Sequence, residues 1–192
     1  MTKLDQIAAL ADDYAKIEEL EHLRSVAKNL VMSRGNPNSP VMFIGEAPGA
    51  DEDEQGKPFV GASGRLLDGF LNRHGIPSSE VYITNLVKYR PTSNRTPFTH
   101  ERELSWPVLE REIEIVNPLV ICTLGATPLK MFLPLLKVSG CHGHPFPWPS
   151  GDCDIFPMWH PAAILRDKTL VSEFDYDMKK LASYVGSLIS RH

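Results

Sequence analysis

Val41-Met42-Phe43-Ile44-Gly45-Glu46-Ala47-Pro48-Gly49 is the stretch of sequence that decides the fold. Its four apolar residues form a run that is too short for an ordinary helix and ends at a glycine, which predicts a buried strand. The glycines that follow let the backbone turn sharply and approach a ligand closely. In an open parallel sheet such a turn lies at the carboxyl edge, where ligands bind. The stretch therefore predicts an α/β sheet and the place of a site on it.

The alternation of strands and helices continues along the chain. Further strands are predicted at residues 81–84, 119–124 and 155–158. Helices are predicted at residues 63–73, 99–116, 125–133 and 171–190, and apolar residues at helical spacing predict one long N-terminal helix over 3–33. Such alternation builds a mostly parallel sheet with helices on both faces. We expect a single α/β domain over residues 1–192, a three-layer α/β/α fold with a short four-stranded sheet on which the N-terminal helix (1–34) packs.

Three predicted loops, at residues 45–61, 85–97 and 160–166, leave the carboxyl ends of strands. They hold most of the chain's unusual polar residues, which places a candidate site where they meet. A fourth segment, residues 138–152, is rich in Gly, Pro and His and is also predicted to be a loop.

Composition narrows the class of protein only a little. The net charge of −4 and the pI of about 6.0 are not those of a typical nucleic-acid binder, although a local basic patch is enough for brief DNA contact. The chain has no apolar run of ~18 residues, so no membrane contact is expected. Its three cysteines form no disulfide framework and its first residues lack a signal-peptide pattern, so we expect a cytoplasmic protein, and a monomer.

Four side chains in these loops are suited to binding a planar ligand. Glu46 could orient or deprotonate a water molecule, and Phe59 offers a stacking surface within a loop. Asn85 can donate and accept hydrogen bonds at once, which suits the edge of a base. His160, followed by a proline, could face charge that develops on a ligand.

Each of these residues also has a purely structural interpretation. Glu46 could be a solvated carboxylate in a tight turn, Phe59 a core anchor, and Asn85 a cap at the end of its strand. His160 could begin a helix that buries Ile164, rather than exposing that residue as a wedge for a base stack. The local sequence leaves both interpretations open.

Taken in order, the motifs resemble the uracil-DNA glycosylase superfamily, most closely its family 4. The resemblance rests on Gly45 to Gly49 with Glu52-Asp53, Gly56 to Gly61 with Gly64-Arg65-Leu66-Leu67, Ile83 to Lys88 with Arg90-Pro91 and Asn94-Arg95, Leu124-Gly125, and His160 to Arg166. Each motif alone is weak, but the ordered set covers about residues 18–170. The resemblance implies hydrolysis of the N-glycosidic bond of a flipped uracil, or of a related modified or deaminated base, in DNA.

The resemblance also implies a role for each matching residue. Glu46 would activate water or stabilise the cationic sugar, and His160 would stabilise negative charge on the leaving base. Four residues would bind the base, namely Ala47, Glu52, Phe59 and Asn85. Six residues would contact DNA, with Ile164 as the wedge: Lys88, Arg90, Asn94, Arg95, Ile164 and Arg166.

One departure from the family pattern is large. Family 4 members hold an iron–sulfur cluster on four cysteines, and this chain has Glu18, Glu21, Tyr89 and Ser105 at those positions. None of these side chains is a thiolate, so no cluster is expected. Side-chain packing must then replace the cluster, and the sequence predicts that the large side chains of Tyr89 and Trp106 fill its space.

Two alternatives stay open beside this hypothesis. Cys141, His142, His144 and Cys153 lie in one predicted loop, but their spacing matches no common zinc module, so no metal is expected. The runner-up function is a non-catalytic module that binds DNA or a modified base with the same pocket.

Overall fold

The sheet at the centre of the molecule has six strands, in the order β1-β3-β2-β4-β6-β5. The computed structural model describes residues 1–190, so the last two residues of the predicted domain 1–192 lie outside the described part. The strands are β1 (Ser33–Gly35), β2 (Val41–Gly45), β3 (Tyr82–Asn85), β4 (Val120–Leu124), β5 (Phe146–Pro147) and β6 (Asp154–Met158). β3, β2, β4 and β6 are parallel, as predicted, while β1 and β5 add antiparallel edges. Both edge strands are too short to produce a periodic signal in the sequence.

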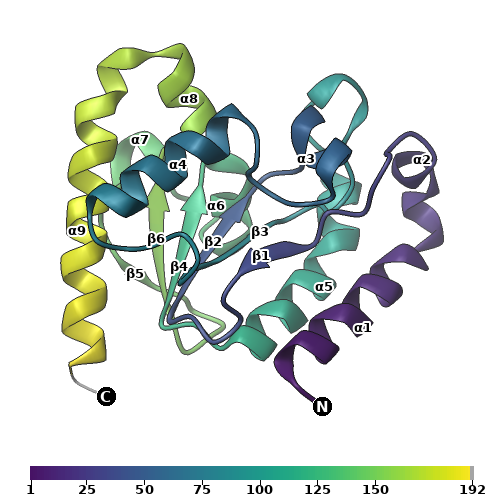
Figure 1. Cartoon of the computed structure of the whole chain (residues 1–192), viewed down its shortest axis with the longest axis horizontal. Coiled ribbons are helices and arrows are strands. Elements are labelled where there is room, and N and C mark those ends of the chain that lie inside the picture. The colour runs from purple at the N-terminus through teal and green to yellow at the C-terminus, as the bar shows by residue number, and fades with distance from the viewer. Residues whose placement is uncertain (191–192) are drawn as a thin grey trace.

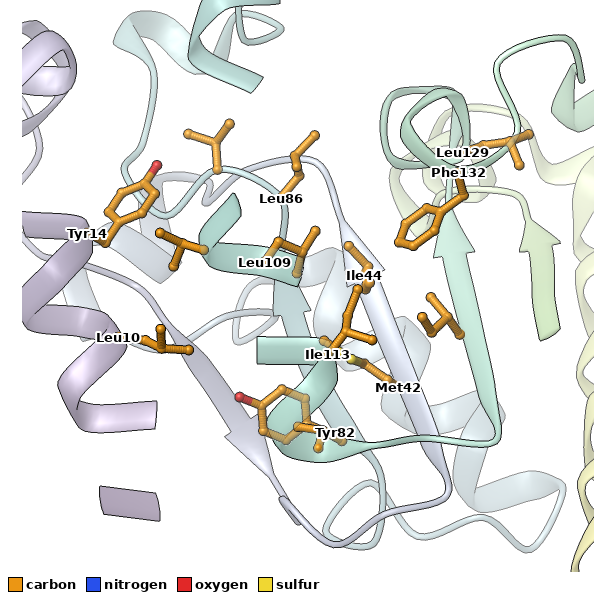
Figure 2. Close-up of a cluster of buried hydrophobic side chains, with 14 of the residues drawn as sticks. Leu10, Tyr14, Met42, Ile44, Tyr82, Leu86, Leu109, Ile113, Leu129 and Phe132 are labelled. Carbon is orange, nitrogen blue, oxygen red and sulfur yellow. The ribbon is translucent and has the colours of Figure 1, made fainter. Parts of the chain in front are cut away.

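Helices cover both faces of this sheet (Figure 1). One face carries α1 (Lys3–Ala15), α5 (Thr99–Val116) and α6 (Ala126–Phe132), and the other carries α4 (Ala62–Arg73), α8 (Pro161–Arg166) and α9 (Val171–Ile189). Successive strand residues point to opposite faces, so Met42 and Ile44 join the first hydrophobic cluster and Val41 and Phe43 the second. Figure 2 shows the first cluster, in which side chains of α5 lie between those of α1 and those of the strands.

The N-terminal helix is much shorter than the prediction over residues 3–33. α1 ends at Ala15, a 3-10 turn (Glu18–Leu20) and the short helix α2 (Glu21–Arg24) follow, and the chain then runs irregularly to β1. A straight helix over the whole span would be about 45 Å long and would carry its last residues past the sheet. The break instead lets Leu20 and Leu23 bury themselves beside α1, whereas Val26 is 56% exposed.

Three of the predicted loops contain short helices. These helices are α3 (Ala50–Gln55), α7 (Val138–Cys141) and α8, and two further 3-10 turns cover Thr92–Asn94 and Lys168–Leu170. One or two turns are too short to give helical periodicity, which is why the sequence did not reveal them. Among the described helices, none combines the length and the hydropathy that a membrane-spanning helix needs.

Candidate active site

The carboxyl ends of the parallel strands open into a cavity of about 640 Å³. β2, β3 and β4 are neighbours, and α8 begins directly after β6, so four separate loops meet at this edge. All six residues that the sequence assigned to catalysis or base binding line the cavity: Glu46, Ala47, Glu52, Phe59, Asn85 and His160.

Asn85, the last residue of β3, lines this cavity and carries a buried hydrogen-bond acceptor that has no partner among the described residues. Its side chain is 2% exposed, and its Oδ1 is buried with no hydrogen-bond partner among the described residues. A buried polar atom without a partner is costly, so its presence on a residue that lines a cavity points to a ligand that supplies the bond. A strand cap would have required this oxygen to accept a main-chain bond, so the purely structural interpretation of Asn85 is not the one found.

The ring of Phe59 forms another wall of the cavity. Phe59 has φ +54°, a left-handed conformation that is uncommon for a bulky residue. Its ring centroid lies 5.9 Å from that of His160. The neighbouring helix α4 can approach only because residue 64 is a glycine, since a Cβ on Gly64 would lie 1.7 Å from the main-chain oxygen of Phe59.

Two charged side chains hold the Phe59 loop from opposite sides. Oε1 of Glu52 accepts hydrogen bonds from the N–H groups of residues 60 and 61, at 3.0 and 2.8 Å. Arg34 donates to the main-chain oxygens of residues 58 and 59, at 3.0 and 3.3 Å, and binds Asp68. Arg34 was missed in the sequence because it lies in edge strand β1, which is too short to give a strand signal. The positive charge of Arg34 was the only feature in the sequence that could have pointed to a functional role.

His160 is held as a neutral imidazole. Its Nδ1 accepts a hydrogen bond of 3.1 Å from the N–H of Ala162 and so caps α8. Burial, with a smaller contribution from the charge of Arg166, lowers the pKa of His160 to about 4. The proton of the neutral ring is therefore on Nε2, which is left as a donor for a ligand.

Glu46 follows β2 and is oriented by a residue that the sequence did not single out. The hydroxyl of Thr127, in α6, donates a hydrogen bond to Oε2 of Glu46, while the main-chain oxygen of Glu46 accepts from Val87 N–H at 3.1 Å. Thr127 was missed because it reads as an ordinary residue in the first turn of a short helix. The bond from Thr127 orients the carboxylate of Glu46 at the cavity, and the bond from Val87 holds the main chain that carries it.

Four of the six residues predicted to contact DNA either line the cavity or bond to a residue that lines it. Asn94, Arg95 and Arg166 line the cavity, and Arg90 donates to Oδ1 of Asn94 at 2.7 Å. Of these, Arg95 is already paired with Glu101, through bonds of 2.8 and 2.6 Å, whereas Arg166 is exposed. Arg166 is therefore the exposed basic residue of the cavity lining, and Arg90 lies beside the lining through its bond to Asn94.

The predictions that Lys88 and Ile164 contact DNA are wrong. Lys88 is fully buried and its ammonium group forms an ion pair with Glu112 at 2.5 Å, so it cannot reach a phosphate. Ile164 is also fully buried, within the cluster that α8 shares with α4 and α9. Its side chain cannot enter a base stack, and the structural interpretation of this segment as the start of a helix was the right one.

Tyr14 connects two of the segments that carry the positions of the family 4 iron–sulfur cysteines, namely α5 and the segment after β3. The hydroxyl of Tyr14 lies 2.8 Å from Oγ of Ser105 and accepts a bond of 3.1 Å from the N–H of Lys88. The rings of Tyr14 and Tyr89 are 5.5 Å apart. Trp106, which was predicted to supply bulk here, instead packs against Phe132 and Trp148.

Within residues 1–190, one group of three candidate metal ligands comes together, formed by His22, His100 and Glu101, and the cysteines and histidines between residues 141 and 153, where no metal was expected, do not form another. The carboxylate of Glu101 already accepts four hydrogen bonds, two from Arg95, one from His22 Nε2 and one from the N–H of Phe98. Although burial opposes the charge, these donors lower the pKa of Glu101 to about 2. A metal ion would have to displace one of them, so the group fits an ion-pair network better than a metal site.

Comparison with known proteins defines the class to which this fold and cavity belong. The sequence pattern of the uracil DNA glycosylase superfamily matches residues 32–182. The chain is 43% identical over 143 residues to the type-4 uracil-DNA glycosylase of Thermotoga maritima, covering 73% of this chain and 74% of that protein. It is 36% identical over 192 residues to the type-4 enzyme of Saccharolobus solfataricus, covering 96% of this chain and 88% of that protein. The corresponding enzyme of Pyrobaculum aerophilum is 38% identical over 179 residues, 88% of each chain. The chain therefore belongs to the uracil-DNA glycosylase superfamily, in its type-4 branch.

Proposed function

We propose that this protein removes uracil from DNA by hydrolysing the bond between the base and its deoxyribose. The observation that carries the proposal is a cavity lined by Phe59, His160 and Asn85, whose buried Oδ1 has no hydrogen-bond partner among the described residues. A base flipped out of the duplex needs a stacking surface, hydrogen bonds to its Watson–Crick edge and a donor for the charge that it acquires. These three residues supply one of each.

The residues of the cavity fit the charges of the reaction. When the bond between C1′ and the base nitrogen breaks, its electron pair stays on the base, and C1′ becomes cation-like. The Nε2–H of His160 would stabilise the negative charge on the base oxygen O2, which a neutral imidazole can do by donating a hydrogen bond. Glu46, held by Thr127, would stabilise the sugar cation and orient the water that adds to C1′.

The cavity rim supports DNA as the partner. Arg166, which lines the cavity, and Arg90, which bonds to the lining residue Asn94, would bind phosphates next to the flipped nucleotide. We further propose that the protein acts as a monomer in the cytoplasm. The three free cysteines support that compartment, because disulfides are rare there. One domain over residues 1–192 is part of this proposal, since both hydrophobic clusters pack on the same sheet.

We also propose that the protein works without an iron–sulfur cluster. Glu18 and Glu21 are exposed on the surface, while Tyr89 and Ser105 are buried against Tyr14. These side chains do not fit a cluster, which needs thiolate ligands. Tyr14 joins α1 to α5 and to the segment after β3, which carry the cluster positions Ser105 and Tyr89. Purified protein should be colourless and free of iron and sulfide, whereas a brown sample that absorbs near ~400 nm would overturn this proposal.

The function is tested with oligonucleotides that carry one uracil, hydroxymethyluracil, hypoxanthine or xanthine, followed by alkaline cleavage of the abasic product. We expect release of uracil, and a loss of about 100-fold or more in rate for His160→Ala and for Asn85→Ala. Tight binding of uracil-containing DNA with no cleavage, unaffected by His160→Ala, would instead favour a non-catalytic binding module. Release of another base in preference to uracil would correct the substrate.

A further inference from the structure

Lys88 is a buried lysine whose ammonium group contacts the main chain of Asn85. It comes three residues after Asn85, and its side chain is fully inaccessible to solvent. Its Nζ donates to three acceptors: Oγ1 of Thr84 at 2.6 Å, the main-chain oxygen of Asn85 at 2.7 Å, and Oε2 of Glu112 at 2.5 Å. An ammonium group has three protons, so every one of them is used.

Glu112 extends this network from α5 to β3. It is also fully buried, and its Oε1 accepts a hydrogen bond of 2.7 Å from the hydroxyl of Tyr82. Burial lowers the pKa of Lys88, and the charge of Glu112 opposes that effect. The carboxylate of Glu112 therefore neutralises the charge of Lys88. Through its bond from Tyr82, it also connects the first residue of β3 to α5.

Stability alone does not explain a charged pair at this place. Two apolar side chains of similar size usually serve a protein core as well as a buried ion pair, or better. What apolar side chains cannot do is donate a hydrogen bond to the main-chain oxygen of Asn85. Asn85 and Gly45 form the last residue pair between β3 and β2, so this oxygen lies at the end of the paired strands.

The Asn85 side chain needs such a support. Its Oδ1 has no hydrogen-bond partner among the described residues, so no bond to that oxygen holds the amide in place. The direction of the amide then depends on the main chain of Asn85 and on the packing around it. A main-chain oxygen that is fixed by a buried ammonium group restricts rotation of the adjoining peptide.

We propose that the buried Lys88–Glu112 pair is a positioning device for base recognition, in which Lys88 fixes the main chain of Asn85 and thereby aims its amide into the cavity. The inference rests on the proposed function for the identity of the base that Asn85 contacts. Lys88 acts through Asn85 and contacts neither DNA nor the base. Base selection in this protein then depends on a charge that solvent and substrate never reach.

The test replaces both charges at once, because a single replacement would leave one buried charge without a partner. In Lys88→Met/Glu112→Gln, the amide of residue 112 can still accept the bond from Tyr82, but nothing donates to the main-chain oxygen of Asn85. Tyr82→Phe is the matched control, because it removes a bond to Glu112 without touching Asn85. Three quantities are measured: the single-turnover rate of uracil release, the affinity for uracil-containing DNA and the midpoint of urea unfolding.

We expect the double variant to release uracil at least about tenfold more slowly, to discriminate less between uracil and cytosine, and to bind DNA with the affinity of the wild type. Tyr82→Phe should unfold at lower urea concentration but keep the rate within about twofold. A folded double variant with the rate and selectivity of the wild type would overturn the inference. So would a loss of DNA affinity with an unchanged rate, because it would mean that Lys88 acts on DNA.

A second pair of substitutions keeps the inference testable if the first variant does not fold. Lys88→Met/Glu112→Leu removes all polar atoms of the pair, an exchange that cores commonly tolerate. It should show the same slow release, and a wild-type rate in this variant would equally overturn the inference. Absence of uracil release in the wild type would contradict the proposed function itself, which separates the two failures.

Discussion

Gly45 and Asn85 are partners in the register between β2 and β3, and a Cβ on Gly45 would lie 2.4 Å from Oδ1 of Asn85 and 2.6 Å from Cζ of Phe59. The amide of Asn85 and the ring of Phe59, which would contact the base, therefore both pack against Gly45, and a side chain at this position would not fit. Backbone freedom is not the reason for this glycine, because its φ is not positive. The reason is space.

Gly45→Ala should therefore displace Asn85, Phe59 or both, and lower the rate of uracil release by about tenfold or more. The control is Gly69→Ala in α4, where a Cβ would meet nothing within 4 Å. That change should leave the rate unaltered and raise stability slightly, since alanine favours the helix. Single-turnover rates and urea unfolding of both variants check the prediction, and an unimpaired Gly45→Ala would contradict it.

The stability of the protein should fall as the pH decreases from about 6.5 towards 4. Burial lowers the pKa of His160 from 6.5 to about 4, so in this window the unfolded chain binds a proton that the folded chain does not. Proton binding to the unfolded state favours unfolding, at a cost of about 3 kcal/mol once the pH is below both values. In His160→Asn the amide oxygen can still cap α8, but the titration is lost, so stability should change less between about pH 7 and pH 5. Urea unfolding across this range checks it, and parallel curves for both proteins would be the contrary result.

Thr127 should matter to catalysis through the hydrogen bond that it donates to Glu46. Thr127→Val keeps the shape of the side chain and removes the hydroxyl, so the rate of uracil release should fall by about tenfold while DNA affinity is preserved. Thr127→Ser keeps the hydroxyl and should restore most of the rate. If the valine and serine variants were equally slow, packing rather than the hydrogen bond would be responsible.

Tyr14→Phe should lower the free energy of unfolding by about 1–3 kcal/mol. The substitution removes the buried hydroxyl that bridges Ser105 and the N–H of Lys88, and it leaves that N–H without an acceptor. Tyr176→Phe, at a position that is 59% exposed, is the control and should cost little. Equal stability of the two variants would show that the hydroxyl of Tyr14 does not hold these segments together.

DNA binding should weaken as salt is raised, because phosphate contacts release counterions. Arg166→Gln should reduce the slope of log K against log salt by about one unit. Arg73→Gln provides the control, since Arg73 ends α4 and pairs with Asp175. Titrations by fluorescence anisotropy at several salt concentrations measure the slopes, and an unchanged slope for Arg166→Gln would place the phosphates elsewhere.

The parallel centre of the sheet could be predicted because each strand carries its own signal. A short apolar run followed by glycine, as at residues 41–45, is a local pattern, and the rule that ligands bind at the carboxyl edge of such sheets placed the site correctly. The clamp on the Phe59 loop could not be predicted in the same way. Arg34 is 25 residues away from Phe59 in the chain, and only the pairing of β1 with β3 brings it near.

The sequence by itself determined the order of the four parallel strands and the six cavity residues assigned to catalysis or base binding, because strand alternation and motif order are properties of neighbouring residues. Only the tertiary structure decided which of the remaining charged and apolar side chains face solvent. Lys88 and Ile164 read as surface residues, yet packing against α5 and α4 encloses them. Burial depends on distant parts of the chain, and for that reason no local pattern could have shown that Lys88 supports Asn85 from within the core.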